Sequence, residues 1–138
     1  MSTHLDTKDL INTQQMEVAV NGPDGATHLI LCTGIASLGS FNHQTFTFLV
    51  GPSLSRRQFV GAIASGAISM IQMHDDILVE PNSATELRAR LAAITVSYDE
   101  ESRQVKVSAE VVSSTATTKL AISYNVSILA ELPIYRVL

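Results

Sequence analysis

Hydrophobic and polar residues alternate most regularly in the C-terminal third of the chain. Over residues 120–128 every second residue is large and apolar, and the residues between them are small or polar. Residues 105–111 and 94–98 alternate in the same way, and residues 99–102 between them have the composition of a turn. A period of two residues is typical of a strand with one buried face. We therefore predict an antiparallel group of three strands here.

Three further strands are predicted in the N-terminal half. Residues 16–20 and 27–33 flank the turn-forming run Asn21-Gly22-Pro23-Asp24-Gly25, which predicts a hairpin. Residues 45–50 alternate again, and Gly51-Pro52 ends this strand because proline cannot donate a ladder hydrogen bond.

Residues 54–73 carry a helical pattern instead. Ser55 and Gln58 have the spacing of a capping box, which predicts a helix that begins at Ser55 and ends near Met73. One apolar stripe has the spacing of a helix face that we expect to pack on the core: Val60, Ile63, Ala64, Ala67, Ile68 and Ile71. A second apolar row comprises Phe59, Ala62, Gly66, Met70 and Met73. We therefore expect this helix to need two covering surfaces.

A second, shorter helix is predicted from the capping box at Ser83-Ala84-Thr85-Glu86 to about Ala92. The element order βββ-α-α-βββ indicates an α+β domain, with antiparallel strands in two groups packed on one long central helix. This single domain covers residues 16–131. A polar N-terminal arm, residues 1–15, precedes it, and an apolar C-terminal tail, residues 132–138, follows it.

Composition narrows the function classes. The net charge is −4 and the nine Lys and Arg are spread along the chain, which excludes the basic surface that a nucleic-acid partner requires. No uncharged apolar run reaches the roughly 20 residues of a membrane span, and no secretory signal opens the chain. We expect the protein in a virion or in the cytoplasm of the producing cell. Cys32, the single cysteine, excludes an internal disulfide.

No catalytic or phosphate-binding motif is present, so we expect no catalytic residue, cofactor, metal or small-molecule ligand. His74-Asp75-Asp76 offers metal-binding groups, but neighbours at a helix end do not converge on one ion, and we interpret them as a solvated helix end. The alternative is a small α+β enzyme or ligand-binding domain with a pocket between sheet and helix. In that case we would inspect His43, His74, Asp75 and Tyr124.

Two features indicate contact with other proteins. Arg56 and Arg57 lie in the first predicted helical turn, where positive charge is mildly unfavourable, so they are candidates for an acidic partner surface. The tail is apolar, whereas free tails are usually polar, which favours docking either on the chain's own domain or on a neighbouring subunit. The expected partner interface comprises Arg56, Arg57, Phe59, Gly66, Met70, Met73, Pro133, Ile134, Tyr135, Val137 and Leu138.

The pattern of residues 86–98, 104–111 and 119–128 resembles the helix-then-hairpin end of small baseplate-wedge or sheath-initiator proteins of contractile phage tails. The Glu-Pro-Arg signature of that family is not matched, because Glu80-Pro81 is followed by Asn82. The resemblance implies a protein that lends strands and helix faces to neighbouring subunits. We therefore expect a non-enzymatic structural or assembly subunit of a multi-protein particle, such as a phage tail, baseplate or neck. It would act on other protein subunits, of its own or another kind, through strand addition, helix-face packing and tail docking.

Overall fold

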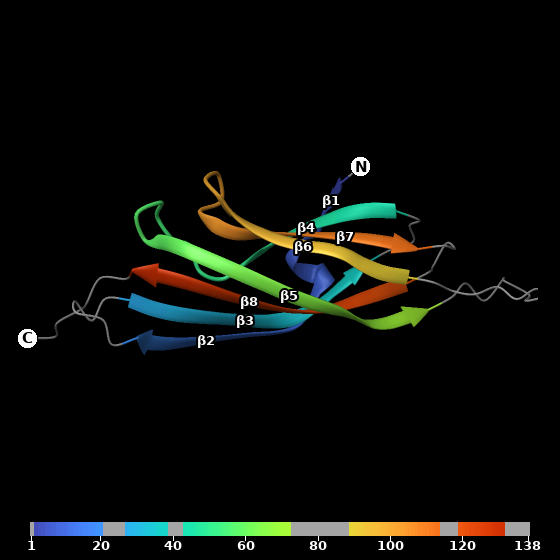
Figure 1. Cartoon of the computed structure of the whole chain (residues 1–138), viewed down its shortest axis with the longest axis horizontal. Coiled ribbons are helices and arrows are strands. Elements are labelled where there is room, and N and C mark those ends of the chain that lie inside the picture. The colour runs from blue at the N-terminus through green and yellow to red at the C-terminus, as the bar shows by residue number, and fades with distance from the viewer. Residues whose placement is uncertain (1, 21–26, 39–42, 73–88, 114–118, 132–138) are drawn as a thin grey trace, which may run out of the picture.

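Two four-stranded sheets face each other in the computed structural model, which describes residues 2–20, 27–38, 43–72, 89–113 and 119–131 (Figure 1). Sheet A has the strand order β1 (Ser2–His4), β4 (His43–Val50), β7 (Gln104–Ser113), β6 (Ala89–Asp99). Sheet B has the order β2 (Leu10–Val20), β3 (Thr27–Leu38), β8 (Lys119–Glu131), β5 (Phe59–Gln72). A 3₁₀ turn, η1 (Thr7–Asp9), is the only helical element among the described residues.

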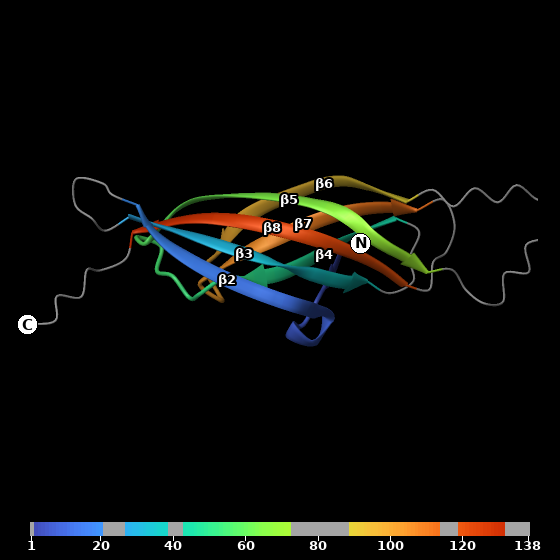
Figure 2. The same cartoon turned by 90° about the horizontal axis from the view of Figure 1, so that it is seen from below.

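Neighbouring strands are antiparallel except for β1 and β4, which run parallel over three residue pairs. The two sheets approach each other along one side, where β5 of sheet B lies next to β6 of sheet A. Figure 2 shows this pair of strands above β8 and β3, with β2 at the opposite border of sheet B. The sandwich is therefore closed on the β5–β6 side and more open on the β2 side.

The inner faces of the sheets form one hydrophobic core. Phe46 and Phe48 from β4 and Val107 from β7 meet Ile122 and Val126 from β8, and all five side chains are at most 3% exposed. Burial of each such side chain stabilises the fold by roughly 1.5–3 kcal/mol. The six strands predicted from alternation are all present, and the residues assigned to their apolar faces in 45–50, 105–111 and 120–128 are buried. Their predicted grouping is wrong, because β4, β6 and β7 belong to sheet A, whereas β2, β3 and β8 belong to sheet B.

The α+β prediction is wrong, because residues 59–72 form strand β5 and not a long central helix. The capping-box hydrogen bonds do form: Ser55 N donates to Gln58 Oε1 at 2.8 Å, and Gln58 N donates to Ser55 Oγ at 3.3 Å. Phe59 N also donates to Ser55 O at 3.2 Å. The helix thus begins as a single turn, and the chain becomes a strand at Phe59.

Two properties of β5 explain this error. Gly61 and Gly66 each weaken a helix by about 1 kcal/mol relative to alanine, while the β-branched residues between and beside them favour a strand. The pairing of β5 with β8 also shifts register between Phe59 and Gly61 and between Ile68 and Met70. Each shift marks a bulge, which adds one residue to the strand. The alternation of inward and outward residues is therefore interrupted twice, and the sequence of β5 shows no continuous period of two.

The second predicted helix is wrong from Ala89 onward, since Ala89–Asp99 is strand β6. Its proposed start at residues 83–88 lies outside the described residues, as does the apolar tail, residues 132–138. Residues 2–15, assigned above to a polar arm, contribute β1, η1 and the first half of β2. Leu5 in this segment is 7% exposed and joins the core.

Candidate interaction surface

Uncharged side chains form four rows across the middle of the outer face of sheet B. Residues paired across an antiparallel sheet point to the same side, so the pairings of β2, β3, β8 and β5 define its rows. In strand order the rows are Val18-Leu29-Leu129-Gly61, Met16-Leu31-Ser127-Ile63, Gln14-Thr33-Asn125-Ser65 and Ile11-Ile35-Ser123-Ala67. We call these residues the sheet B outer face. None of them carries a charge, and none is buried.

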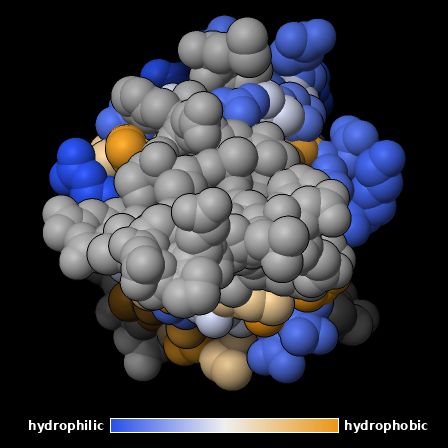
Figure 3. All heavy atoms as spheres, turned by 90° about the vertical axis from the view of Figure 1, so that its right-hand side faces the viewer, coloured by the Kyte–Doolittle hydropathy of each residue, from blue (hydrophilic) through white to orange (hydrophobic). Residues whose placement is uncertain are grey.

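Exposed large hydrophobic residues are concentrated on the two outermost strands of this sheet. Among the described residues they are Ile11 (48% exposed), Met16 (62%), Val18 (43%), Val20 (41%), Val60 (52%), Ile63 (73%) and Met70 (46%). All belong to β2 or β5. In Figure 3 hydrophobic residues gather along the lower border of the molecule, on the side where sheet B lies. An exposed apolar patch of this kind is typical of a protein–protein interface.

The outer face of sheet A has the opposite character. Its rows are Thr45-Glu110-Ala93, Thr47-Ser108-Thr95 and Leu49-Lys106-Ser97, which combine hydroxyl groups with two charges of opposite sign. Such a surface is readily solvated. The outer face of sheet A is therefore the more polar of the two.

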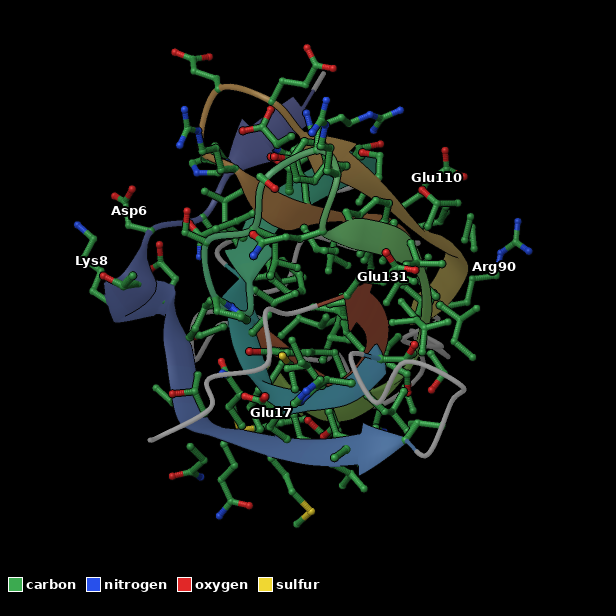
Figure 4. All side chains as sticks on the ribbon, turned by 90° about the vertical axis from the view of Figure 1, so that its left-hand side faces the viewer. Asp6, Lys8, Glu17, Arg90, Glu110 and Glu131 are labelled. Atoms are coloured by element: carbon green, nitrogen blue, oxygen red, sulfur yellow. The ribbon has the colours of Figure 1, made fainter. Side chains whose placement is uncertain are left out.

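Charged residues near β2 point away from the sheet B outer face. Glu17 pairs with Ile30, a core residue, and Figure 4 shows its side chain on the side of β2 that faces sheet A. Its Oε1 lies 2.7 Å from His28 Nδ1, and this contact becomes an ion pair when the imidazole is protonated. The carboxylate thus lies on the inner side of β2, where its side chain is 44% exposed, while Met16 and Val18 on either side of it face outward.

The residues expected at a partner interface are separated by the fold. Arg56 and Arg57 are exposed in the turn before β5, and Arg56 Cζ lies 5.4 Å from the centre of the Tyr98 ring. Phe59 faces inward and stacks on the same ring, with centroids 5.3 Å apart. Gly66 also faces inward, because it pairs with Tyr124, a core residue.

Met70 is the only expected interface residue that adds an exposed large hydrophobic side chain to sheet B within the described part of the chain. Met73, Pro133, Ile134, Tyr135, Val137 and Leu138 lie outside the described residues. Sequence reasoning missed Met16, Val18 and Ile63. The sequence did contain a pattern that groups Met16 and Val18 on one face. If residues 14–20 form a strand, their large apolar side chains lie on one face and the charged Glu17 lies on the other.

A cavity of about 270 Å³ opens between the sheets on the β2 side. Its lining is uncharged and includes Gln14, Gln15, Gln104, Cys32 and Tyr124. Burial raises the pKa of Cys32, and burial together with the neighbouring Cys32 raises the pKa of Tyr124. Both groups are therefore neutral at pH 7, and the cavity suits an uncharged molecule.

Of the ligand-site candidates named from the sequence, Tyr124 lines this cavity, whereas His74 and Asp75 lie outside the described residues. His43 begins β4. Within the described ranges no three His, Cys, Asp or Glu side chains lie close enough to hold a metal ion. The same part of the chain contains no helix with the length and apolar character to cross a membrane.

Comparison of the chain with known protein families, with curated proteins and with solved structures gave no match. The fold and its surfaces therefore carry the functional argument.

Proposed function

We propose that the protein is a non-enzymatic structural subunit of a multi-protein particle and that it docks onto neighbouring subunits through the sheet B outer face. One observation carries this proposal: the exposed large hydrophobic residues of the described chain all lie on β2 and β5 of this sheet. Covering such a surface with a partner stabilises the complex by about 25 cal/mol for each Å² of apolar area removed from water. Association is the usual way in which proteins cover it.

The mode of docking differs from the one expected from the sequence. Packing through a central helix is ruled out by β5, so a sheet face takes its place. Strand addition at a sheet edge and docking of the apolar tail remain part of the proposal. The particle that we propose is part of a virion, namely a phage tail, baseplate or neck.

Size fractionation tests this function directly. An affinity-tagged chain is expressed in the producing cell, and the extract is separated by sedimentation. The proposal predicts that the chain sediments with material much heavier than one 14.8 kDa subunit. Recovery of the chain entirely at the position of a single subunit contradicts it.

A second candidate function, binding of a small uncharged ligand, is favoured by the cavity on the β2 side. Its wall combines hydrogen-bonding amides with the Tyr124 side chain and carries no charge. A neutral monosaccharide serves as a first probe. A rise in Tm with added monosaccharide in the native chain that is absent in Tyr124→Phe supports this function. A monosaccharide-induced change in Tm that is the same in both proteins counts against it.

A further inference from the structure

We infer that β2 pairs with β2 of a second copy of the chain, antiparallel and about a two-fold axis at Val18, so that two B sheets join into one continuous sheet. This inference rests on the proposed function and names the first neighbour in the assembly. It follows from the state of the sheet edges, the chemistry of β2 and the distribution of charge.

β2 is the long open edge of the described sandwich. Each sheet has two edge strands: β1 and β6 in sheet A, and β2 and β5 in sheet B. β5 and β6 lie against each other, and β1 has only three residues. β2 has eleven residues, and its outer backbone groups face away from β3. An edge of this kind presents N–H and C=O groups to which another strand can pair.

Little in β2 opposes such pairing. Natural edges are protected by proline, by charged side chains or by bulges. β2 contains no proline and one charged residue, Glu17. Its bulge lies between Ile11 and Gln14, where Asn12 has a φ of 53°. The protection is therefore confined to the first part of the strand, and the edge from Gln15 to Val20 is regular.

The chemistry of this edge fits a second copy of β2. An added strand must be extended, and its outward residues must be apolar to continue the sheet B outer face. β2 itself has these properties, with Met16, Val18 and Val20 facing outward. Two identical chains of net charge −4 repel each other, least where neither surface carries charge. The residues of the sheet B outer face carry no charge, and the one charge of β2, Glu17, points to the other side of the strand.

The axis position follows from the side chains. With the axis at Val18, Val18 faces its own copy, Met16 faces Val20, and Glu17 faces Ala19. Apolar residues then meet apolar residues on the outer side. An axis at Glu17 would place two carboxylates opposite each other, which is destabilising. An axis at Met16 would set Gln14 against Val18 and bring the bulged segment into the pairing.

Sedimentation of the purified protein tests the inference. We expect a mass of two chains at high concentration, against 14.8 kDa for one. Val18→Lys opposes two ammonium groups at the axis and should return the mass to that of one chain. The matched control Thr95→Lys adds the same charge on the outer face of sheet A and should leave the dimer intact. Both positions are exposed, so neither lysine disturbs the core.

Disulfide trapping gives an independent measure of the axis. Val18→Cys should form a disulfide-linked dimer under mild oxidation, whereas Ser97→Cys, exposed on sheet A, should not, and native Cys32 is buried. A purified protein that stays monomeric, or a dimer that survives Val18→Lys, overturns the inference. A monomer after purification that still sediments with heavy material in the cell extract overturns the β2 dimer alone and leaves the proposed function standing.

Discussion

The ring of Tyr124 lies directly over Gly34 of the neighbouring strand. A Cβ atom on residue 34 would stand 2.8 Å from Tyr124 Cζ and closer still to Oη. The ring is fixed from the other side by Phe48, with centroids 4.8 Å apart, and Tyr124 is 3% exposed. The absence of a side chain at residue 34 is thus what allows an aromatic ring to fill the middle of the sandwich.

Gly34→Ala should therefore lower the free energy of unfolding by about 1–3 kcal/mol, because an extra methyl group in a packed core forces the ring to move. Urea denaturation measures this change. Adding Tyr124→Phe removes the nearest atom, Oη, and should recover part of the loss. A Gly34→Ala protein as stable as the native chain would show that the ring is not held in place.

Gly66 and Gly61 provide a matched pair on β5. A Cβ on Gly66 would lie 3.2 Å from Ile94 Cδ1 and 3.3 Å from Leu91 Cδ2, where β5 meets β6. A Cβ on Gly61 meets nothing within 4 Å. We expect Gly66→Ala to destabilise the protein by about 1 kcal/mol or more. Gly61→Ala should stabilise it by up to roughly 1 kcal/mol, because glycine weakens a strand. Equal effects of the two changes on Tm would contradict the close β5–β6 approach.

Tyr98 connects sheet A to the segment between β4 and β5 through a hydrogen bond. Its hydroxyl donates to the carbonyl oxygen of Leu54 at 2.5 Å, and Leu54 is 2% exposed. Tyr98→Phe keeps the aromatic stack on Phe59 but removes this donor. The loss should be about 1–3 kcal/mol, the usual effect of leaving a buried acceptor without its partner. Chemical denaturation of Tyr98→Phe, with Ser97→Ala as the control at an exposed neighbouring position, measures it.

The β6–β7 turn should respond to acid through Asp99. Hydrogen bonds from the Ser102 side chain (2.5 Å) and backbone N–H (3.1 Å) hold the pKa of this carboxyl below its ordinary 3.8. A lowered pKa means that the carboxylate stabilises the fold above 3.8 and that this contribution disappears as pH falls through the folded-state pKa. Asp99→Asn should flatten the dependence of Tm on pH in that acidic range, whereas Glu100→Gln should not. Parallel acid profiles for native and Asp99→Asn proteins would rule out this role.

Alternation in the sequence was sufficient to predict the six strands whose residues keep a strict period of two, such as Leu120 to Ile128. It failed at β5, where two bulges change which residues face the core and where the same apolar residues also satisfy a helical spacing. The Ser55–Gln58 pair was a correct local signal, but its hydrogen bonds extend over one turn only. Pairing with β8 then determines that residues 59–72 form a strand. Because β8 lies far away in the sequence, the local pattern of residues 59–72 cannot predict this pairing.

The exposed hydrophobic residues of sheet B could be predicted in part. Met70 was predicted to be exposed at an interface and is 46% exposed, whereas Ile63 was assigned to the core side of a helix and is 73% exposed on the outer face of a strand. Which residues share a face depends on the secondary structure, so the wrong element for β5 led to the wrong face. Phe59 and Gly66 were placed on the partner surface for the same reason, although both face the interior.

The proposed function requires that the sheet B outer face binds neighbouring subunits. Its most direct test compares two lysine substitutions in the sedimentation of the tagged chain from the producing cell. Ile63→Lys places a charge on the β5 border of this face, and Thr95→Lys places the same charge on the outer face of sheet A. Both sites are exposed, so the stability of the single chain should change by no more than about 0.5 kcal/mol. We predict that Ile63→Lys moves the chain from heavy fractions to the position of one subunit, while Thr95→Lys sediments like the native protein. Heavy sedimentation of Ile63→Lys, equal to that of the native chain, would contradict the account.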